Sequence, residues 1–150
     1  MKSHIMYFVL AVLVGGGAVY FYKTKCKKCC SGGEKNVEIK LISAQELKQE
    51  MEDNDNLVVI NVLDKETYDD CKIPDSVNYD YENLKDTAKS LDKSKDYVVY
   101  CASKMCHASK EAFKILNSMG FKVRAFEDGM KGWKDEGFET EGPCQAGYLK

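Results

Sequence analysis

The sequence predicts an α/β domain with a largely parallel sheet, and three observations support this fold class. From residue 37 onward, short strand-like runs alternate with helix-like segments. Two of those runs, 57–62 and 97–100, are almost entirely apolar, as expected of strands that are buried on both faces. The chain has 150 residues, of which 44% are hydrophobic and 31% charged, so it can form one globular core of ordinary size.

The first half of the domain begins with a strand and a helix. Residues 37–42 alternate apolar and polar side chains like a short strand. Ser43 and Glu46 then have the spacing of a capping box, which predicts a helix that ends near Asp53. The buried strand 57–62 follows, and after it come three further features: a short helix capped by Asp64 and carrying Tyr68, a turn at 73–75, and a short strand at 76–79.

The second half repeats the alternation. Residues 81–91 have helical spacing, and 97–100 form the next buried strand. The remaining elements are an amphipathic helix at 108–119 ended by Gly120, a strand at 122–126, and a short helix at 129–135 with Trp133. These segments predict five strands, and their alternation with helices predicts that most of them pair in parallel.

A different segment precedes this domain. Residues 5–22 carry no charge over 18 positions, and as a helix they would extend about 27 Å, close to the thickness of a bilayer core. We expect a single membrane anchor, since a cleaved signal peptide would have a more basic start and a small-residue cleavage site. The lysines crowd the C-terminal side of this segment, which predicts a cytoplasmic domain, although an exported domain stays open.

The predicted organisation therefore has five parts. A basic linker follows the anchor and contains Cys26, Cys29 and Cys30, for which acylation, a soft metal or simple reduced thiols are all open. The parts are a flank at 1–4, the anchor at 5–22, the linker at 23–36, the α/β domain at 37–142 and a tail at 143–150. The net charge is −2 and the two signs are interspersed, so the sequence predicts no nucleic-acid partner.

The candidate reactive site follows the strand 97–100. Cys101 comes where that strand ends, and Cys106 comes just before the next helix. In parallel sheets, ligands bind at the carboxyl ends of the strands, where backbone amides and a helix N-terminus favour an anion. Lys104 and His107 add positive charge, so we expect Cys101 to be a nucleophile. A zinc site at Cys101, Cys106 and His107 lacks a fourth ligand.

Several segments in the correct order resemble a single rhodanese, or sulfurtransferase, domain. Residues 58–62, Tyr68 and the Ile-Pro-Asp-Ser-Val-Asn run at 73–78 are similar to the family's first signature. Residues 98–101 are similar to the strand that ends in the active cysteine. The helix residues, the Gly-Phe pair and the closing Gly-x-x-x-Trp element also match, at Ala108, Ala112, Leu116, Gly120, Phe121, Gly129 and Trp133.

The resemblance implies a three-layer fold around a mainly parallel five-stranded sheet, and a persulfide on Cys101 that is passed to a thiol or another nucleophile. It also implies that the amides of the active-site loop, Ala102, Ser103, Lys104, Met105 and Cys106, cradle the sulfur without a metal or cofactor. The expected partners are a small sulfur donor and a thiol acceptor, which can be a protein. The loop counts six residues and ends without an arginine, which favours sulfur transfer over the related phosphatases.

The sequence departs from the family pattern at several positions. Asn61 replaces the usual Asp, Leu63 the usual Arg, and Asp75 a Gly. In the loop, Cys106 stands in place of a common arginine and Lys104 in place of a common glycine. These departures put thiosulfate as the donor in doubt. They favour the alternative of a non-catalytic binding or thiol-redox sensing module that uses Cys101 and Cys106.

The roles of the other candidate residues stay open at this point. Cys106 is either a resolving thiol that closes a disulfide with Cys101 or a small apolar side chain in the core. His107 is more simply an exposed residue at a helix start than a catalytic group. Cys71 is expected to be a buried free cysteine and Cys144 a mobile thiol in the tail, which suits a reducing compartment.

Overall fold

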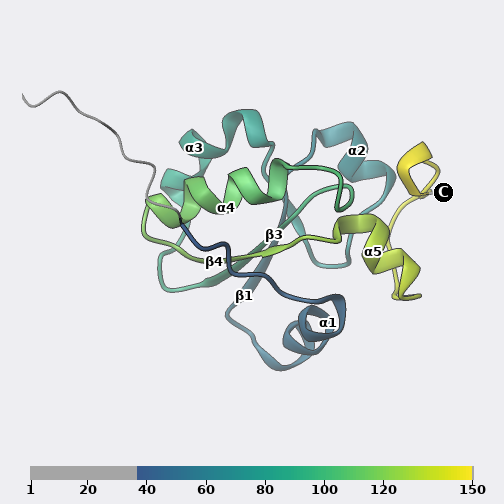
Figure 1. The fold of residues 1–150 in the computed structure, drawn as a ribbon, viewed down its shortest axis with the longest axis horizontal. Coiled ribbons are helices and arrows are strands. Elements are labelled where there is room, and N and C mark those ends of the chain that lie inside the picture. The colour runs from purple at the N-terminus through teal and green to yellow at the C-terminus, as the bar shows by residue number, and fades with distance from the viewer. Residues whose placement is uncertain (1–36, 150) are drawn as a thin grey trace, which may run out of the picture. The chain divides into compact units, whose positions relative to one another are not determined.

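Four parallel strands form the centre of the computed structural model, which describes residues 37–149 (Figure 1). They are β1 (Leu57–Asn61), β2 (Val77–Asn78), β3 (Asp96–Tyr100) and β4 (Lys122–Phe126). Their order in the sheet is β2-β1-β3-β4, and all three pairings are parallel. The register places Asn61 beside Tyr100, and Tyr100 beside Phe126. The α/β class and the mainly parallel sheet are therefore confirmed.

The expected fifth strand at 37–42 is reduced to a single contact. Leu41 forms an isolated parallel bridge with Ala125, where the Ile42 amide donates to the Ala125 carbonyl at 3.1 Å and the Ala125 amide donates to the Lys40 carbonyl at 2.8 Å. The pairing stops there because Ser43 caps the next helix one residue later, with both hydrogen bonds of a capping box present.

The helices and 3-10 turns connect the strands and cover both faces of the sheet. The elements are α1 (Ala44–Asp53), α2 (Lys65–Asp70), η1 (Tyr81–Asn83), α3 (Leu84–Thr87), η2 (Ala88–Ser90), α4 (Ala108–Ser118), α5 (Gly129–Asp135) and η3 (Gly147–Leu149). The helix expected at 81–91 is broken into η1, α3 and η2, of which only Leu84 and Ala88 are buried. With two anchoring side chains, this segment has too little apolar surface to order one continuous helix.

The two faces of the sheet carry separate apolar cores. In Figure 1, α3 and α4 lie on one side of the sheet and α1 lies on the other. On the first side, Val99, Phe113 and Leu116 pack together in one cluster. On the second side, Leu47 from α1 and Trp133 from α5 belong to the other cluster. This division follows from the alternation of side chains along a strand, which sends Cys101 to the α4 side and Tyr100 to the α1 side.

The C-terminal segment folds back over the edge of the domain, and we call residues 139–149 the C-terminal strap. Lys72 and Glu141 exchange two backbone hydrogen bonds of 2.9 Å each. The Cys144 amide donates to the Asp70 carbonyl at 2.8 Å, and Leu149 is buried in the same cluster as α5. The strap is therefore ordered by backbone pairing and by a buried apolar end.

Cys71 and Cys144 form a disulfide in this strap, over a sequence separation of 73 residues. The expectations of a free Cys71 and a mobile Cys144 thiol were therefore wrong. Cys71 is fully buried at the end of α2, and the pairing of Lys72 with Glu141 brings the tail to it. This long-range pairing leaves no local pattern in the sequence.

The predicted anchor at 5–22 and the linker cysteines Cys26, Cys29 and Cys30 lie outside the described residues. Within 37–149, no helix combines the length and the apolar character that crossing a bilayer requires.

Candidate active site

Cys101 is the first residue after β3, at the edge where the parallel strands end. Its side chain is 0% exposed and belongs to the core cluster on the α4 side. Six residues, 101–106, connect β3 to His107, whose backbone angles are already helical, and α4 begins at the next residue. The structure therefore places Cys101 and Cys106 at the two ends of one short loop, as the sequence predicted.

The loop is held by the start of α5. The Met130 amide donates to the Cys101 carbonyl at 2.8 Å, and the Lys131 amide donates to the Ala102 carbonyl at 2.9 Å. This close approach requires glycine at position 129, because a Cβ there would lie 2.5 Å from the Cys101 carbonyl oxygen. Gly129 also has a φ of 62°, which glycine adopts without strain. The conformation of the loop therefore depends on a helix that begins almost thirty residues later.

Tyr100 fixes the strand that carries the loop from the opposite face. Its hydroxyl accepts from the Ile73 amide at 3.2 Å and shares a hydrogen bond of 3.0 Å with the Ser76 hydroxyl. Tyr68 donates to the Ser76 carbonyl, so the same network includes α2. Burial raises the pKa of Tyr100, which keeps its hydroxyl neutral and available as a donor.

Two departures from the family pattern can now be read in the structure. Asp75 has a φ of 58°, a left-handed conformation that explains why the family commonly has glycine there. Asn61 is fully buried, and its Oδ1 accepts from the Leu63 amide at 2.8 Å. Its Nδ2 has no hydrogen-bond partner. An aspartate would offer only acceptors at this position, so the asparagine keeps the turn but adds an unsatisfied donor.

The sulfur of Cys101 faces acceptor groups inside the loop. Its Sγ lies 3.3 Å from the Cys106 carbonyl oxygen and 3.7 Å from that of Ser103. The Ser109 hydroxyl, in the first turn of α4, lies 3.4 Å away. The Cys106 amide donates to the Ser103 carbonyl at 2.9 Å and so is not aimed at the sulfur. The amide cradle of residues 102–106 stays a prediction, and the resting loop presents carbonyls to the thiol.

Burial raises the pKa of the Cys101 thiol, because the thiolate loses its hydration. The Ser109 hydrogen bond acts in the opposite direction and lowers that pKa, whereas the neighbouring Cys106 thiol raises it. The net effect is an upward shift, so the resting site holds a neutral thiol at neutral pH. Any reaction of Cys101 as a nucleophile therefore requires that this thiol first lose its proton.

Ser109 was not among the residues singled out from the sequence as site residues. It is fully buried and begins the inward stripe of α4, which continues with Ala112, Phe113 and Leu116. The sequence does contain a signal for it. Ser109 has helical spacing to three apolar residues, which places its hydroxyl on the buried face of the helix. Buried polar groups are hydrogen-bonded, and here the partner is the sulfur.

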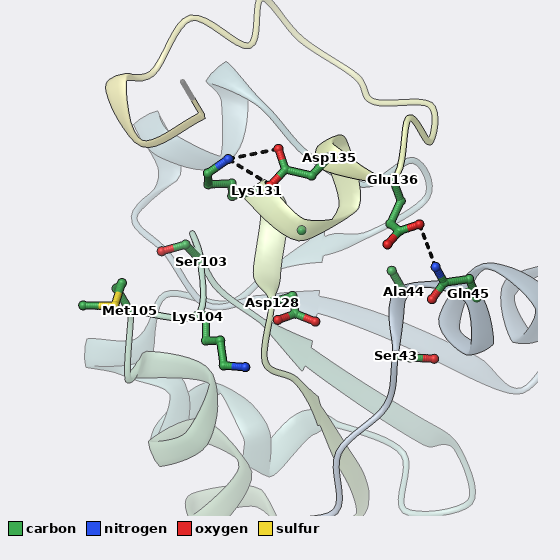
Figure 2. Close-up of a pocket in the computed structure, with 11 residues that line it drawn as sticks. Ser43, Ala44, Gln45, Ser103, Lys104, Met105, Asp128, Lys131, Asp135 and Glu136 are labelled. Carbon is green, nitrogen blue, oxygen red and sulfur yellow. Dashed lines mark hydrogen bonds and ion pairs between the residues drawn. The ribbon is translucent and has the colours of Figure 1, made fainter.

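Lys104, Met105 and His107 lie at the surface of the loop. Met105 is 86% exposed, and His107 precedes α4 without a side-chain capping bond. Figure 2 shows the Lys104 side chain extended below Asp128, while Met105 points to the other side of the loop. Neither Lys104 nor His107 appears among the hydrogen-bond partners of the Cys101 sulfur. Both side chains are therefore exposed beside the loop and do not contact the sulfur.

A pocket of about 460 Å³ lies beside the loop, between it, α5 and the start of α1 (Figure 2). Two contacts lie in the walls of this pocket. Lys131 pairs with Asp135 at 2.9 Å, and the side-chain amide of Gln45 donates to the Glu136 carboxylate at 2.6 Å. Its lining residues are Ser43, Ala44, Gln45, Ser103, Lys104, Met105, Asp128, Lys131, Gly132, Asp135 and Glu136. Cys101 is not among them, so the pocket borders the outer surface of the loop and does not open onto the sulfur.

Cysteine thiolates are also ligands for soft metal ions. Within the described part of the chain, no group of three or more His, Cys, Asp or Glu side chains is arranged to hold a metal ion. Cys101 and Cys106 are both free thiols.

Cys101 thus lies at the end of a parallel strand, in a six-residue loop that leads into α4 and is held by the start of α5. The family model for the rhodanese-like domain matches residues 43–136. The chain therefore belongs to the rhodanese-like domain family, as the sequence resemblance predicted.

Known proteins agree with this assignment. The chain is 35% identical over 100 residues to "Putative sulfurtransferase YtwF" of Bacillus subtilis, an alignment that covers 67% of this chain and 95% of that protein. The BH2092 protein of Bacillus halodurans has a similar structure, with a TM-score of 0.66, 26% identity, and coverage of 70% of this chain and 78% of that one. The Alr3790 protein of Anabaena has a TM-score of 0.62, 33% identity, and coverage of 67% and 80%. At the level of the family, a sulfurtransferase-type function is supported.

Proposed function

We propose that the protein is a sulfurtransferase that carries sulfane sulfur as a persulfide on Cys101. The observation that carries the proposal is the position of this free cysteine at the end of β3, inside a loop fixed by α5. The family membership and the sulfurtransferase name of the Bacillus relative support the same reaction type. A rigid frame of this kind holds a nucleophile in one geometry relative to an incoming donor.

The proposed step is a displacement at sulfur. The Cys101 thiolate attacks the outer sulfur of a donor, the sulfur–sulfur bond of the donor breaks, and the electron pair leaves with the remaining fragment. With thiosulfate the leaving group is sulfite, and with a low-molecular-weight persulfide it is a thiolate. The proton of Cys101 goes to solvent, and the hydroxyl of Ser109 can turn to donate to the thiolate or to the new persulfide. An external thiol then removes the outer sulfur.

The intact mass of the full-length chain tests this proposal. After incubation of Cys106→Ser protein, which cannot close a Cys101–Cys106 disulfide, with thiosulfate or a low-molecular-weight persulfide, we expect a gain of one sulfur atom on the peptide that contains Cys101. In the same Cys106→Ser background, Cys101→Ser should abolish this gain, whereas Lys134→Ala, a change at an exposed residue of α5 outside the loop, should keep it. Sulfur uptake that persists in Cys101→Ser would show that another thiol is the carrier and would overturn the proposal.

The burial of Cys101 favours a second candidate, a non-catalytic binding or thiol-redox sensing module. A thiol that is 0% exposed and held neutral is protected from donors in the resting state. In such a module Cys101 and Cys106 would change their oxidation state without carrying sulfur. The same mass measurement on Cys106→Ser protein separates the two candidates, because the sensing module gains no sulfur from any donor, whereas the carrier gains one sulfur atom.

The proposal includes attachment to a membrane through residues 5–22, with the domain in an oxidising compartment. The lysines after this segment favour a cytoplasmic domain, whereas the Cys71–Cys144 disulfide favours an exported one. We give more weight to the disulfide, because exported domains with short anchors can break the charge rule, whereas stable disulfides are rare in a reducing compartment. A membrane-impermeant protease added to intact cells should digest the domain, and protection from it would place the domain in the cytoplasm.

A further inference from the structure

Cys106 occupies the end of the active-site loop, where the family resemblance predicts an arginine. An arginine there could hold an anionic donor but could not exchange sulfur. The one arginine of the sequence, Arg124, is bound to Glu50 instead. The substitution therefore removes a clamp for anions and adds a second thiol to the same loop, next to the proposed sulfur carrier.

The fold of the loop brings this second thiol close to the first. The Ser103 carbonyl accepts from the Cys106 amide, which turns the chain back toward its start. The Cys106 carbonyl oxygen lies 3.3 Å from the Cys101 sulfur. Since a carbonyl oxygen is about 2.4 Å from the Cα of its own residue, the Cα of Cys106 lies within about 6 Å of that sulfur. A disulfide joins cysteines whose Cα atoms lie roughly 4.4–6.8 Å apart, and a Cys106 Cα this close to the Cys101 sulfur is compatible with that range after a small adjustment of the loop.

The two thiols differ in their access to solvent. Cys101 is fully buried, and Cys106 is partly buried against the same core cluster. An external acceptor would have to open the loop to reach a persulfide on Cys101, whereas Cys106 already lies inside it. Because Cys106 has a solvent-accessible side, a disulfide formed through it could be attacked from outside. The loop thus contains a thiol that can attack a persulfide on Cys101 from within, and the resulting disulfide can be reduced from solvent through Cys106.

We propose that Cys106 is a resolving thiol that releases the sulfane sulfur of Cys101 as hydrogen sulfide. This inference rests on the proposed function, since it requires a persulfide on Cys101. The Cys106 thiolate attacks the inner sulfur of that persulfide, the bond to the outer sulfur breaks, and the outer sulfur leaves with the electron pair as hydrosulfide. One proton from the Cys106 thiol balances the step, so a persulfide and a thiol become a Cys101–Cys106 disulfide and hydrogen sulfide.

An external dithiol completes the cycle. It attacks the partly exposed Cys106 sulfur, forms a mixed disulfide, and closes its own disulfide as Cys101 and Cys106 return to thiols. The dithiol is oxidised by two electrons, and the sulfane sulfur is reduced to sulfide by the same two. The substrate class assigned to the second half of the reaction is therefore a dithiol, small or carried by a protein, that acts as a reductant and not as a sulfur acceptor.

The experiment is a single turnover of the full-length protein without oxygen or added reductant. One equivalent of a low-molecular-weight persulfide is added, and released sulfide is measured together with a non-reducing tryptic digest. Trypsin cleaves after Lys104, so a Cys101–Cys106 disulfide appears as peptides 96–104 and 105–110 joined together. The wild-type protein should release one equivalent of sulfide and give the joined peptides.

Cys106→Ser is the matched variant, because serine keeps the size of the side chain and removes the sulfur. It should retain one extra sulfur on peptide 96–104, and its release of sulfide should be slower by about tenfold or more, since the attacking thiol within the loop is removed. The thiol that the donor sets free is present equally in both samples, so the difference between them reports the internal step.

Two results would overturn the inference, and they are distinguishable. If the wild-type protein keeps its persulfide as long as Cys106→Ser does and gives no joined peptides, Cys106 is not a resolving thiol, and the sulfurtransferase proposal stands. If neither protein takes up sulfur on peptide 96–104 and neither releases sulfide, the proposed function is wrong, and the inference is wrong with it.

Discussion

Two pairs of cysteines lie on opposite sides of the same sheet and are used differently. Cys71 and Cys144 are 73 positions apart, belong to the α1 and α5 side, and are joined by a disulfide. Cys101 and Cys106 are five positions apart, belong to the α4 side, and are free. The disulfide of the distant pair closes a long loop, whereas a bond between the near pair would close a very short one. Only the first bond therefore contributes much to stability.

The comparison also shows how the surroundings decide the chemistry of a thiol. The disulfide is supported by backbone pairing between Lys72 and Glu141 and by the hydrogen bond from the Cys144 amide to Asp70, which hold its two ends together. The near pair sits in a loop of turns, where carbonyls face the sulfur and one partner is partly exposed. We therefore expect changes in the first pair to affect folding and changes in the second to affect reactivity.

The largest effect should come from the nucleophile. Cys101→Ser should reduce sulfur transfer by roughly 10³-fold or more, as is found when a nucleophile is removed. Because the hydroxyl is nearly isosteric and Ser109 remains as a partner, the melting temperature should change little. Rates are measured with a saturating persulfide donor and stability by thermal unfolding. A large fall in the melting temperature would contradict the expectation that changes in the free pair of cysteines affect reactivity and not folding.

The next effect is on stability. Cys144→Ser should lower the free energy of unfolding by about 2–4 kcal/mol, because the unfolded chain gains entropy once the loop between cysteines 73 positions apart is no longer closed. The melting temperature should fall by on the order of 10 °C. Sulfur loading at 20 °C should stay within about twofold of wild type, because the folded site is unchanged. Wild-type protein treated with a reductant is the control, and equal melting temperatures before and after reduction would contradict the prediction.

The raised pKa of Cys101 predicts a particular pH profile. A raised thiol pKa means a smaller thiolate fraction at a given pH, so alkylation of peptide 96–104 should be slow at neutral pH. The alkylation rate should keep rising at pH values where the rate for an ordinary thiol, with a pKa of about 8.5, has already levelled off. The same peptide in protein unfolded with urea serves as the reference. If alkylation of the folded protein rises at lower pH than alkylation of the unfolded reference, then amides and cations lower the pKa of Cys101 by more than burial raises it.

Ser109 should have a smaller effect that acts through Cys101. Ser109→Ala removes a hydrogen bond of 3.4 Å that lowers the pKa of the thiol, so the alkylation profile should move further toward high pH. Sulfur loading should fall by up to about tenfold, the size expected for one hydrogen bond. Ser109→Thr should restore part of the rate. A slower rate with an unchanged pH profile would indicate a packing role only.

Lys104 should have the smallest effect. Its side chain is exposed and lies beside the pocket, so Lys104→Ala should reduce loading from an anionic donor by about two- to threefold. The loss should shrink at high salt, because exposed charges are screened. Lys134→Ala, an exposed lysine of α5 outside the pocket lining, is the control. Equal effects of the two variants would show that the charge of Lys104 has no special position.

Much of the fold could be predicted because its signals are local. The bounds expected for the last helix, 129–135, and the last strand, 122–126, agree with α5 and β4. The capping box at Ser43 and the end of α4 before Gly120 were also read from neighbouring residues. The helix expected at 81–91 was less successful, because helical spacing does not show how much of a segment reaches the core.

The sequence by itself determined the order of the elements, the position of Cys101 at the end of a buried strand, and the presence of Cys106 in the same loop. These features depend on periodicity and spacing, which act over a few residues. Only the tertiary structure decided that Cys71 bonds to Cys144, that Ser109 contacts the sulfur, and that Gly129 lies against the Cys101 carbonyl. Each of these contacts depends on how separate elements pack together, and packing is set by the whole core and not by any one segment.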